Sequence, residues 1–171
     1  MHYTNRTGFQ LGDNSNLFDF TFVKNVAHAH LLCAAALLAT AKMSTTPLDR
    51  ERVDGEAFFI TNGSPIPFWD FARAVWAAAG STKGTEHVWV IGKDFGLGLA
   101  GFVEGLFWII GKTPNLTRMK VNFSCMTRYF NIDKAKTRLG YQPLVPLDEG
   151  IKITVNHFED ERVKEGEKKG Q

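Results

Sequence analysis

Short hydrophobic runs, separated by polar and glycine-containing segments, predict strands near the start and in the middle of the chain. Two extended runs, residues 8–11 and 17–23, flank the sequence GDNSN, in which Gly, Asp and Asn tolerate the tight backbone conformations of a turn. We therefore expect a hairpin, or a strand, a loop and a second strand. The apolar runs at residues 57–61 (AFFIT) and 87–91 (HVWVI) predict two more strands.

Longer apolar stretches predict helices. The alanine-rich stretch 26–41 lacks Gly and Pro and is apolar on nearly every side, so we expect a buried helix whose start is capped by Asn25. A helix is also expected at 68–79, stopped by Gly80, because Gly readily adopts the left-handed conformation that closes a helix. Strands and helices that alternate in this way are typical of an α/β fold.

The second half of the chain predicts mainly helices. The run 95–111 contains one charged residue, Glu104, and predicts a helix despite its glycines. Three shorter helices are expected at 116–123 after Pro114 and Thr117, at 134–139 between Asp133 and Gly140, and at 149–161 after Asp148, with an extended segment at 126–132. The charged tail, residues 159–171, is expected to fray into water.

Composition restricts the class of protein. The 171 residues, 44% hydrophobic and 22% charged, fit one folded domain and exclude a disordered chain, collagen and a disulfide scaffold. The net charge of +2, with no basic stripe, predicts no nucleic-acid partner. Cys33 and Cys125 stand in apolar sequence and are expected to be buried thiols.

Several short sequence patterns, the sequons and the histidines, predict no functional site. No signal-peptide-like apolar segment is visible at the start, so the N-x-S/T sequons are expected to have arisen by chance. His28 and His30 stand two residues apart on a predicted helix, which points their rings to opposite sides and excludes a shared metal ion. The other histidines, His2, His87 and His157, are isolated in the sequence. The sequons begin at Asn5, Asn62, Asn115 and Asn122.

The run 95–111 contains the pattern G-x-G-x-x-G at Gly96, Gly98 and Gly101, directly after a predicted strand. A dinucleotide-binding turn also needs an acidic residue about 20 positions later, and no Asp or Glu occurs between Glu104 and Asp133. The pattern therefore disfavours a nucleotide site.

Two alternatives remain open for this run, which at 17 residues is shorter than the roughly 20 needed to span a bilayer. It either dips into a membrane interface, with flanking basic residues at the lipid headgroups, or forms a lid over an apolar pocket. The dilysine pattern at Lys168 and Lys169 is of the kind that retrieves membrane proteins to the endoplasmic reticulum, and it points weakly to that membrane. The flanking basic residues are Lys93, Lys112, Arg118 and Lys120.

Three stretches together resemble the C-terminal half of an extended short-chain dehydrogenase. They are NLFDFTFVKNVAHAHLLCA at residues 16–34, GEAFFITNGSPIPFWDF at 55–71 and TRYFNIDKAKTRLGYQPLVPLDEGI at 127–151. The phrase TPNLTRMKV at 113–121 is similar to the 3β-hydroxysteroid dehydrogenase branch, and within it to the sterol-4α-carboxylate 3-dehydrogenases (decarboxylating) of fungal-type sterol synthesis.

The resemblance implies an α/β fold over residues 1–158, with partial Rossmann-like sheet elements and the mostly helical substrate-binding lobe of an extended short-chain dehydrogenase. It implies sterol biosynthesis, with NAD- or NADP-dependent oxidation of the 3β-hydroxyl of a 4α-carboxysterol. The new carbonyl lies β to the carboxylate and accepts the electrons released as CO₂ leaves. Expected partners are the sterol substrate, other sterol-demethylation enzymes and a second copy of the chain. The expected location is the cytosolic face of the endoplasmic reticulum membrane, with the cytoplasm as the alternative.

The residues that perform this chemistry in the family are not recognisable in the chain. The family pairs a general acid/base tyrosine with a cofactor-holding lysine four residues later. The glycine-rich turn of a first dinucleotide-binding unit is not recognisable either. We therefore expect no catalytic, cofactor-binding or metal-binding residue here and no turnover by the chain alone. Tyr3, Tyr129 and Tyr141 are followed at the lysine position by Thr7, Asp133 and Val145.

Six residues are expected to bind substrate. By resemblance, Arg128 and Tyr129 lie near the mouth of a ligand pocket; alternatively, Arg128 pairs with Asp133 and fixes the C-terminal helix. Four apolar residues are expected to line a sterol-sized cavity or to touch membrane: Phe102, Leu106, Phe107 and Trp108. The alternative function is a non-catalytic, membrane-associated module that binds sterol or docks on a sterol enzyme.

Overall fold

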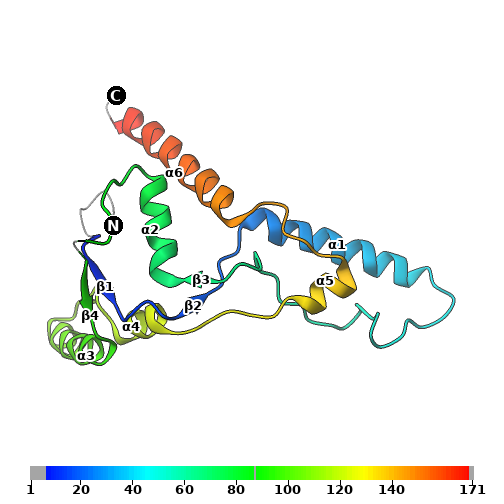
Figure 1. Ribbon diagram of the computed structural model, residues 1–171, viewed down its shortest axis with the longest axis horizontal. Helices are drawn as coiled ribbons and strands as arrows, with labels where there is room; N and C mark the ends of the chain where they lie inside the picture. The colour runs from blue at the N-terminus through cyan, green and yellow to red at the C-terminus, as the bar shows by residue number, and fades with distance from the viewer. Residues whose placement is uncertain (1–6, 87, 170–171) are drawn as a thin grey trace. The chain divides into compact units, whose positions relative to one another are not determined.

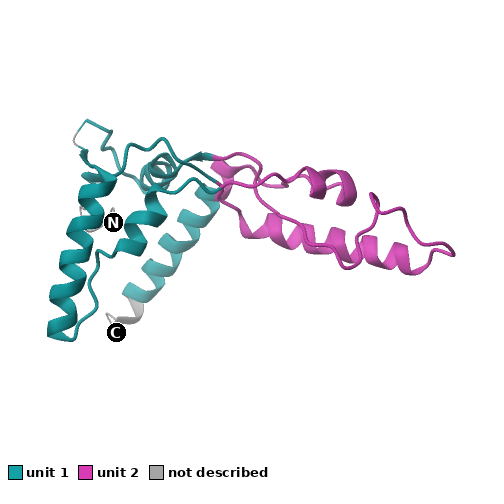
Figure 2. Ribbon diagram, turned by 90° about the horizontal axis from the view of Figure 1, so that it is seen from below, with its two compact units in different colours: residues 1–18, 66–128, 151–171 teal, residues 19–65, 129–150 magenta. Residues whose placement is uncertain are grey.

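The computed structural model describes residues 7–86 and 88–169, and the chain divides into two compact units. The first unit comprises residues 1–18, 66–128 and 151–171, and the second comprises residues 19–65 and 129–150 (Figure 2). Helices dominate, with two small two-stranded sheets among the described residues. This mixture is compatible with part of an α/β fold.

The strands of the first unit form two separate pairs. β1 (Phe9–Leu11) runs parallel to β4 (Trp89–Ile91), and β2 (Leu17–Phe18) runs antiparallel to β3 (Ile66–Pro67) (Figure 1). The two strands at the start of the chain are therefore joined by a loop and do not form a hairpin. His87, at the start of the predicted strand 87–91, lies outside the described residues.

The predicted helices of the first unit are present. α2 (Phe68–Ala78) is followed by Gly80 with a φ of +85°, as expected for a closing glycine. α3 (Lys93–Ile110) ends at the left-handed Gly111, and α4 (Arg118–Cys125) begins with the Thr117 side chain accepting the Lys120 N–H at 3.2 Å. The core of this unit consists of Leu11, Trp69, Ala100 and Val121.

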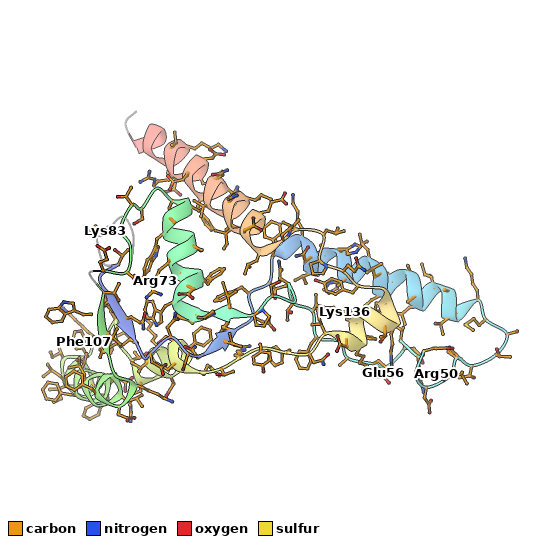
Figure 3. The ribbon with its side chains drawn as sticks, viewed as in Figure 1. Arg50, Glu56, Arg73, Lys83, Phe107 and Lys136 are labelled. Atoms are coloured by element: carbon orange, nitrogen blue, oxygen red, sulfur yellow. The ribbon has the colours of Figure 1, made fainter. Side chains whose placement is uncertain are left out.

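The loop after β1 is fastened to α2. Asn14 has a φ of +63°, and its side-chain oxygen accepts the Trp69 N–H at 2.8 Å, which caps the start of α2 from a distant part of the chain. The Trp69 indole donates to the Leu11 carbonyl at 2.8 Å. Arg73 projects from α2 and donates to the Gln10 side chain on β1 (Figure 3). These bonds hold β1 and α2 together.

The second unit is built on α1 (Val23–Ala41) and the short α5 (Asp133–Leu139), which lie side by side (Figure 1). The expectation of an α1 buried all round is wrong. Only Asn25 and Ala29 are buried, whereas Leu31 is 71% exposed. The reason is size, because the seven residues of α5 cover only one side of a nineteen-residue helix.

Asn25 does not cap α1 as expected, because the helix begins two residues earlier and its N-cap residue, Phe22, makes no side-chain capping bond. The fully buried Asn25 amide instead accepts the N–H groups of Leu144 and Val145 at 2.9 and 3.0 Å. It donates to Asn62 and to the Val145 carbonyl at 2.9 and 2.8 Å. Asn25 therefore joins α1 to two distant loops.

The predicted strand at residues 57–61 is not a strand. Side chains bind its carbonyl groups in place of a neighbouring strand: the buried Tyr141 hydroxyl donates to the Thr61 carbonyl at 2.9 Å, and Lys134 donates to the Ala57 carbonyl at 2.9 Å. Burial raises the pKa of the Tyr141 hydroxyl. Glu56 forms ion pairs with Lys134 at 2.5 Å and Arg138 at 3.5 Å, which tie this segment to α5 (Figure 3).

The final helix is longer than expected. α6 (Leu147–Lys169) begins before Asp148 and continues through the stretch predicted to fray, although residues 159–166 are mostly exposed. Ion pairs three residues apart, Arg162 with Glu159 and Lys164 with Glu161, support this exposed helix. α5 ends at the left-handed Gly140 as predicted, but Asp133 lies in its first turn and makes no N-cap bond.

The cysteines and the sequon asparagines differ in how deeply they are buried. Cys33 and Cys125 are half-buried free thiols, and so are less buried than expected. Asn62 is buried, and its side-chain amide accepts the Phe22 N–H and donates to the Val145 carbonyl. Both the oxygen and the nitrogen of this amide therefore have hydrogen-bond partners inside the fold. Asn115 and Asn122 are exposed, and Asn5 lies outside the described residues.

Gly12, which follows β1, lies close to Cys125 of α4, and a substitution at Gly12 tests this close approach. Gly12 has a φ of +76°, and an added Cβ would lie 2.8 Å from the Cys125 Sγ. Gly12→Ala should lower the free energy of unfolding by about 3 kcal/mol. Gly80→Ala should lower it by about 1 kcal/mol, because the backbone there has a positive φ but an added Cβ would meet no other atom within 4 Å. Urea denaturation measures both, and equal losses would contradict the close approach. Adding Cys125→Ala should recover part of the loss for Gly12 alone.

The Asn25 amide should dominate the stability of the second unit. Asn25→Ala leaves the N–H groups of Leu144 and Val145 buried without an acceptor and should cost about 3 kcal/mol in urea denaturation. The matched control is Asn122→Ala, at an exposed position of α4, which should change stability by less than about 0.5 kcal/mol. A loss no larger than that of the control would refute this role.

Candidate functional site

α3 is the candidate site that carries most of the residues predicted to bind substrate, and one side of it packs into the first unit. Gly96 and Ala100 are buried on this side. A Cβ added at Gly96 would lie 3.4 Å from the side chains of Leu11 and Val121. Small residues at these positions therefore let α3 approach β1 and α4 closely.

The opposite side of α3 faces solvent and is apolar. Phe102 is 71% exposed and Trp108 is 83% exposed, Leu106 is also exposed, and Phe107 is partly buried. The structure thus places these four predicted residues on one helix, but three of them point away from the core. They line no part of the 380 Å³ pocket in the second unit, which is formed by Lys136, Gly140, Tyr141, Gln142 and Pro143.

The single charge within the apolar run has a structural partner. The Glu104 carboxylate accepts the Arg118 backbone N–H at 2.9 Å and the Arg118 Nε–H at 2.7 Å. Glu104 therefore caps the start of α4 and joins it to α3. These hydrogen bonds, the side-chain one first, hold the pKa of Glu104 below its usual range. A carboxylate held ionised in this way is poorly suited to act as a general acid.

Arg128 lies at the end of the first unit, beside β2. Its backbone N–H donates to the Leu17 carbonyl at 2.8 Å, and its guanidinium carbon lies 5.9 Å from the centre of the Phe18 ring. The alternative expectation, an ion pair with Asp133, stays a prediction, because Asp133 belongs to the second unit. The Asp133 carboxylate bonds to Asn131 and Lys136, and these two bonds lower its pKa, the Asn131 bond most strongly.

Tyr129 is exposed at the start of a segment of the second unit that Asp19 holds in place. The Asp19 Oδ2 accepts the Phe130 N–H at 2.8 Å, and the Phe130 ring stacks on Phe59 with centroids 4.4 Å apart. The sequence does not reveal this contact of Asp19, because 111 residues separate it from Phe130 in the chain. The Asp19 Oδ1 is buried and has no hydrogen-bond partner among the described residues. Asp19 therefore positions the segment that follows Tyr129.

The G-x-G-x-x-G pattern does not form a phosphate-binding turn. All three glycines lie inside α3, and the Gly96 N–H donates to the Gly92 carbonyl at 2.9 Å. A dinucleotide phosphate needs free N–H groups at the start of a helix. Gly96, Gly98 and Gly101 therefore do not fit the nicotinamide cofactor that the resemblance implies.

The two histidines of α1 have different surroundings. His28 is partly buried with its ring 6.3 Å from that of Tyr141, and His30 is exposed and contacts the Val26 carbonyl at 2.8 Å. The described part of the chain contains no cluster of His, Cys, Asp or Glu able to hold a metal ion. One described helix, α1, is long and apolar enough to cross a membrane. Near the start of this helix, the buried Asn25 side chain bonds to two loops of the second unit.

Comparison with known proteins decides the family. Residues 2–90 match the 3-beta hydroxysteroid dehydrogenase/isomerase family. The chain belongs to this family. Among solved structures, none matches the chain significantly.

Curated relatives of this 3-beta hydroxysteroid dehydrogenase/isomerase family member share a narrower name. The sterol-4-alpha-carboxylate 3-dehydrogenase (decarboxylating) of Schizosaccharomyces pombe is 45% identical over 92% of the chain and 43% of the relative. The namesake of Saccharomyces cerevisiae is 44% identical over 86% of the chain and 40% of the relative. The enzyme of the same name from Homo sapiens is 34% identical over 88% of the chain and 38% of the relative. The family member thus spans about two fifths of the length of these relatives.

The Glu104–Arg118 pair should make the first unit sensitive to acid. The folded pKa of Glu104 lies below its ordinary value of 4.5, so the pair stabilises the fold fully above that value. This stabilisation is lost as the pH falls through the lower folded pKa. Glu104→Gln should therefore be less stable than the unmodified protein at about pH 7 and should lose less stability between pH 5 and pH 3.

Urea denaturation across this pH range measures the difference between the two proteins. The control is Glu165→Gln on the exposed part of α6, whose pH dependence should follow that of the unmodified protein. If the stability of the Glu104→Gln variant fell as steeply with acid as that of the unmodified protein, the pair would carry no such stabilisation.

Proposed function

We propose that this family member supplies the substrate-side portion of a sterol-4α-carboxylate 3-dehydrogenase. The complete enzyme would use NAD or NADP to oxidise the 3β-hydroxyl of a 4α-carboxysterol, with loss of CO₂. The observation that carries the proposal is the 45% identity with the Schizosaccharomyces pombe relative, which extends over 92% of the chain. That match includes both compact units and is not confined to one motif.

The chemistry of a sterol supports a substrate-side role. A sterol offers a large ring face and few hydrogen-bonding groups, so apolar side chains supply most of its binding free energy, at about 25 cal/mol per Å² buried. Phe102, Leu106 and Trp108 offer apolar surface that the first unit does not use internally. Arg128 and Tyr129 offer a cation and a hydroxyl, which suit the carboxylate and the 3β-oxygen of the substrate.

The hydride and proton transfers would be performed outside these 171 residues. The sequence contains no tyrosine followed four residues later by lysine, and the glycines of α3 do not fit a dinucleotide phosphate. The proposed role of the chain is therefore to bind and orient the sterol next to a dinucleotide-binding portion. By itself it should not reduce NAD⁺ or NADP⁺.

The proposed location is the cytosolic face of the endoplasmic reticulum membrane, where a sterol is available from the bilayer. The proposed partners there are the sterol, other sterol-demethylation enzymes and a second copy of the chain. A non-catalytic, membrane-associated sterol-binding or docking module is the second candidate function. The exposed apolar side of α3 favours it, because a soluble surface helix is ordinarily polar on that side.

An exchange experiment tests the catalytic proposal. The matching stretch of the Schizosaccharomyces pombe relative is replaced by this chain, and NADH formation from a 4-carboxysterol is measured for the chimera and for the isolated chain. We expect turnover by the chimera and none by the isolated chain. A folded chimera without turnover that still binds sterol would favour the non-catalytic module. NADH formation by the isolated chain would overturn the division of roles.

A variant pair in the chimera tests the proposed ligand contact of Arg128. Arg128→Ala should raise KM for the 4-carboxysterol about tenfold, because a charge-assisted hydrogen bond to the carboxylate is lost. Arg50→Ala, at an exposed arginine in the segment between α1 and β3, is the matched control and should leave KM unchanged. Equal KM values for both variants would remove Arg128 from the substrate site.

A further inference from the structure

Asn62 is followed directly by Gly63, and no other asparagine of the chain precedes a glycine. An asparagine side chain can be attacked at its amide carbon by the backbone nitrogen of the next residue, which removes the amide group. Glycine favours this attack because it has no Cβ to hinder the approach and its backbone rotates most freely. Asn62 is therefore the asparagine of this chain that is chemically most prone to lose its amide.

The reaction consumes only water. The Gly63 nitrogen forms a bond to the Asn62 Cγ, and the bond between Cγ and Nδ2 breaks. The Nδ2 group leaves as ammonia, together with the proton that the Gly63 nitrogen loses. The cyclic imide that remains takes up one water molecule and opens at either of its carbonyls. The product is aspartate, or isoaspartate, in which the main chain runs through the former side-chain carbon.

The native second unit holds the amide that would react. The Asn62 Oδ1 accepts the Phe22 N–H and the Asn25 amide N–H, each at 2.9 Å. The Asn62 Nδ2, which would have to leave, donates to the Val145 carbonyl at 3.0 Å. Since Asn62 is also buried, its amide carbon cannot turn toward the next backbone nitrogen without breaking these bonds.

The attacking nitrogen is held as well. The Gly63 N–H donates to the Thr61 Oγ1 at 3.0 Å, and a hydrogen bond from an N–H group opposes loss of its proton. The backbone at Gly63 has a φ of +64°, and an added Cβ would lie 3.1 Å from the Ile132 Cδ1. The backbone on both sides of the Asn62 amide is thus fixed, so the attack requires this segment to open first.

The products do not fit the site that Asn62 occupies. Neither aspartate nor isoaspartate has a side-chain N–H for the Val145 carbonyl, and each brings a negative charge. The groups that bond to the Asn62 side chain within the described part of the chain are all neutral, from Phe22, Asn25 and Val145. A buried charge without a cationic partner is strongly destabilising. Isoaspartate also adds a carbon atom to the main chain between Thr61 and Gly63.

We propose that Asn62 and Gly63 form a self-modification site, which the folded second unit keeps inert and which deamidates when that unit opens. Deamidation makes the opening irreversible, because the reacted chain cannot rebuild the hydrogen bonds that join α1 to its loops. The modified fraction therefore accumulates with the time that the second unit spends open. All the residues involved belong to this unit (Figure 2), and the inference does not depend on the proposed dehydrogenase role.

Peptide mass spectrometry of the full chain measures the reaction, in native buffer and in urea at the same neutral pH and temperature. In urea, Asn62 should deamidate at least about tenfold faster than Asn115 and Asn122, which precede larger residues. Gly63→Ala should remove this difference in urea, where its effect on folding plays no part. In native buffer, Asn62 should react at least about tenfold more slowly than in urea.

Hydrogen exchange tests whether opening of the network controls the reaction. The Leu144 and Val145 N–H groups bond to the Asn25 Oδ1, so their protection factors report this opening. The protection factors should equal the slowing of deamidation at Asn62 within about threefold. Asn25→Ala should accelerate the native reaction at Asn62 at least about tenfold, whereas the control Asn122→Ala should leave it unchanged. The exchange comparison needs only the unmodified chain and decides the point if Asn25→Ala does not fold.

The substitution Asn62→Asp reproduces one of the products and tests its consequence. Asn62→Asp should lower the urea midpoint by at least about 1 M, because the Val145 carbonyl loses a donor and a charge is buried. The matched control is Asn122→Asp, at an exposed position of α4, which should leave the midpoint unchanged.

Several results would overturn the proposal. Equal rates at Asn62 in native buffer and in urea would show that the fold gives no protection. Equal rates at Asn62 and Asn115 in urea would remove the intrinsic reactivity. Protection factors far above the slowing of deamidation would show that Asn62 reacts without opening of the network, and an unchanged midpoint for Asn62→Asp would show that the product fits. None of these results bears on turnover by the chimera, so the two proposals fail separately.

Discussion

The close packing of α3 at Gly96 and Ala100 is the constraint on which the first unit depends. Because Gly96 has no side chain and Ala100 has only a methyl group, Leu11 of β1 and Val121 of α4 approach the backbone of α3 closely, and Glu104 accepts the Arg118 N–H in the first turn of α4. This packing places Gly96 and Ala100 at the interior contact and leaves most of the large side chains of the helix exposed. The exposed aromatic side chains of α3 are thus a consequence of how its interior contact is made.

Local sequence signals predicted most of the helices and the positions at which several of them end. Gly80, Gly111 and Gly140 all adopt positive φ next to helix ends, because a residue without a Cβ closes a helix at low cost. The prediction of a strand at AFFIT was wrong because its carbonyl groups accept hydrogen bonds from the side chains of Tyr141 and Lys134. A pattern of hydrophobic residues cannot indicate such side-chain partners.

Long-range polar contacts were the least predictable part of the candidate site. Asn25 was identified as a hydrogen-bonding residue at the start of α1, but its partners are 37 to 120 residues away in the sequence. Asp19 likewise binds a backbone group 111 residues away. The sequence motif could suggest that these residues matter, since their side chains suit turns and caps, yet the partner is set by tertiary structure. The roles proposed for Arg128 and Tyr129 come from resemblance and stay predictions.

The buried amide of Asn62 has a consequence for the sequon that begins there. Asn62 begins an N-x-S sequon, yet both ends of its amide are occupied within the fold, by Phe22 and Asn25 on one side and by Val145 on the other. A sugar attached to that nitrogen before folding would permanently separate the loops that it joins. The native fold around this amide therefore excludes a sugar on the Asn62 nitrogen.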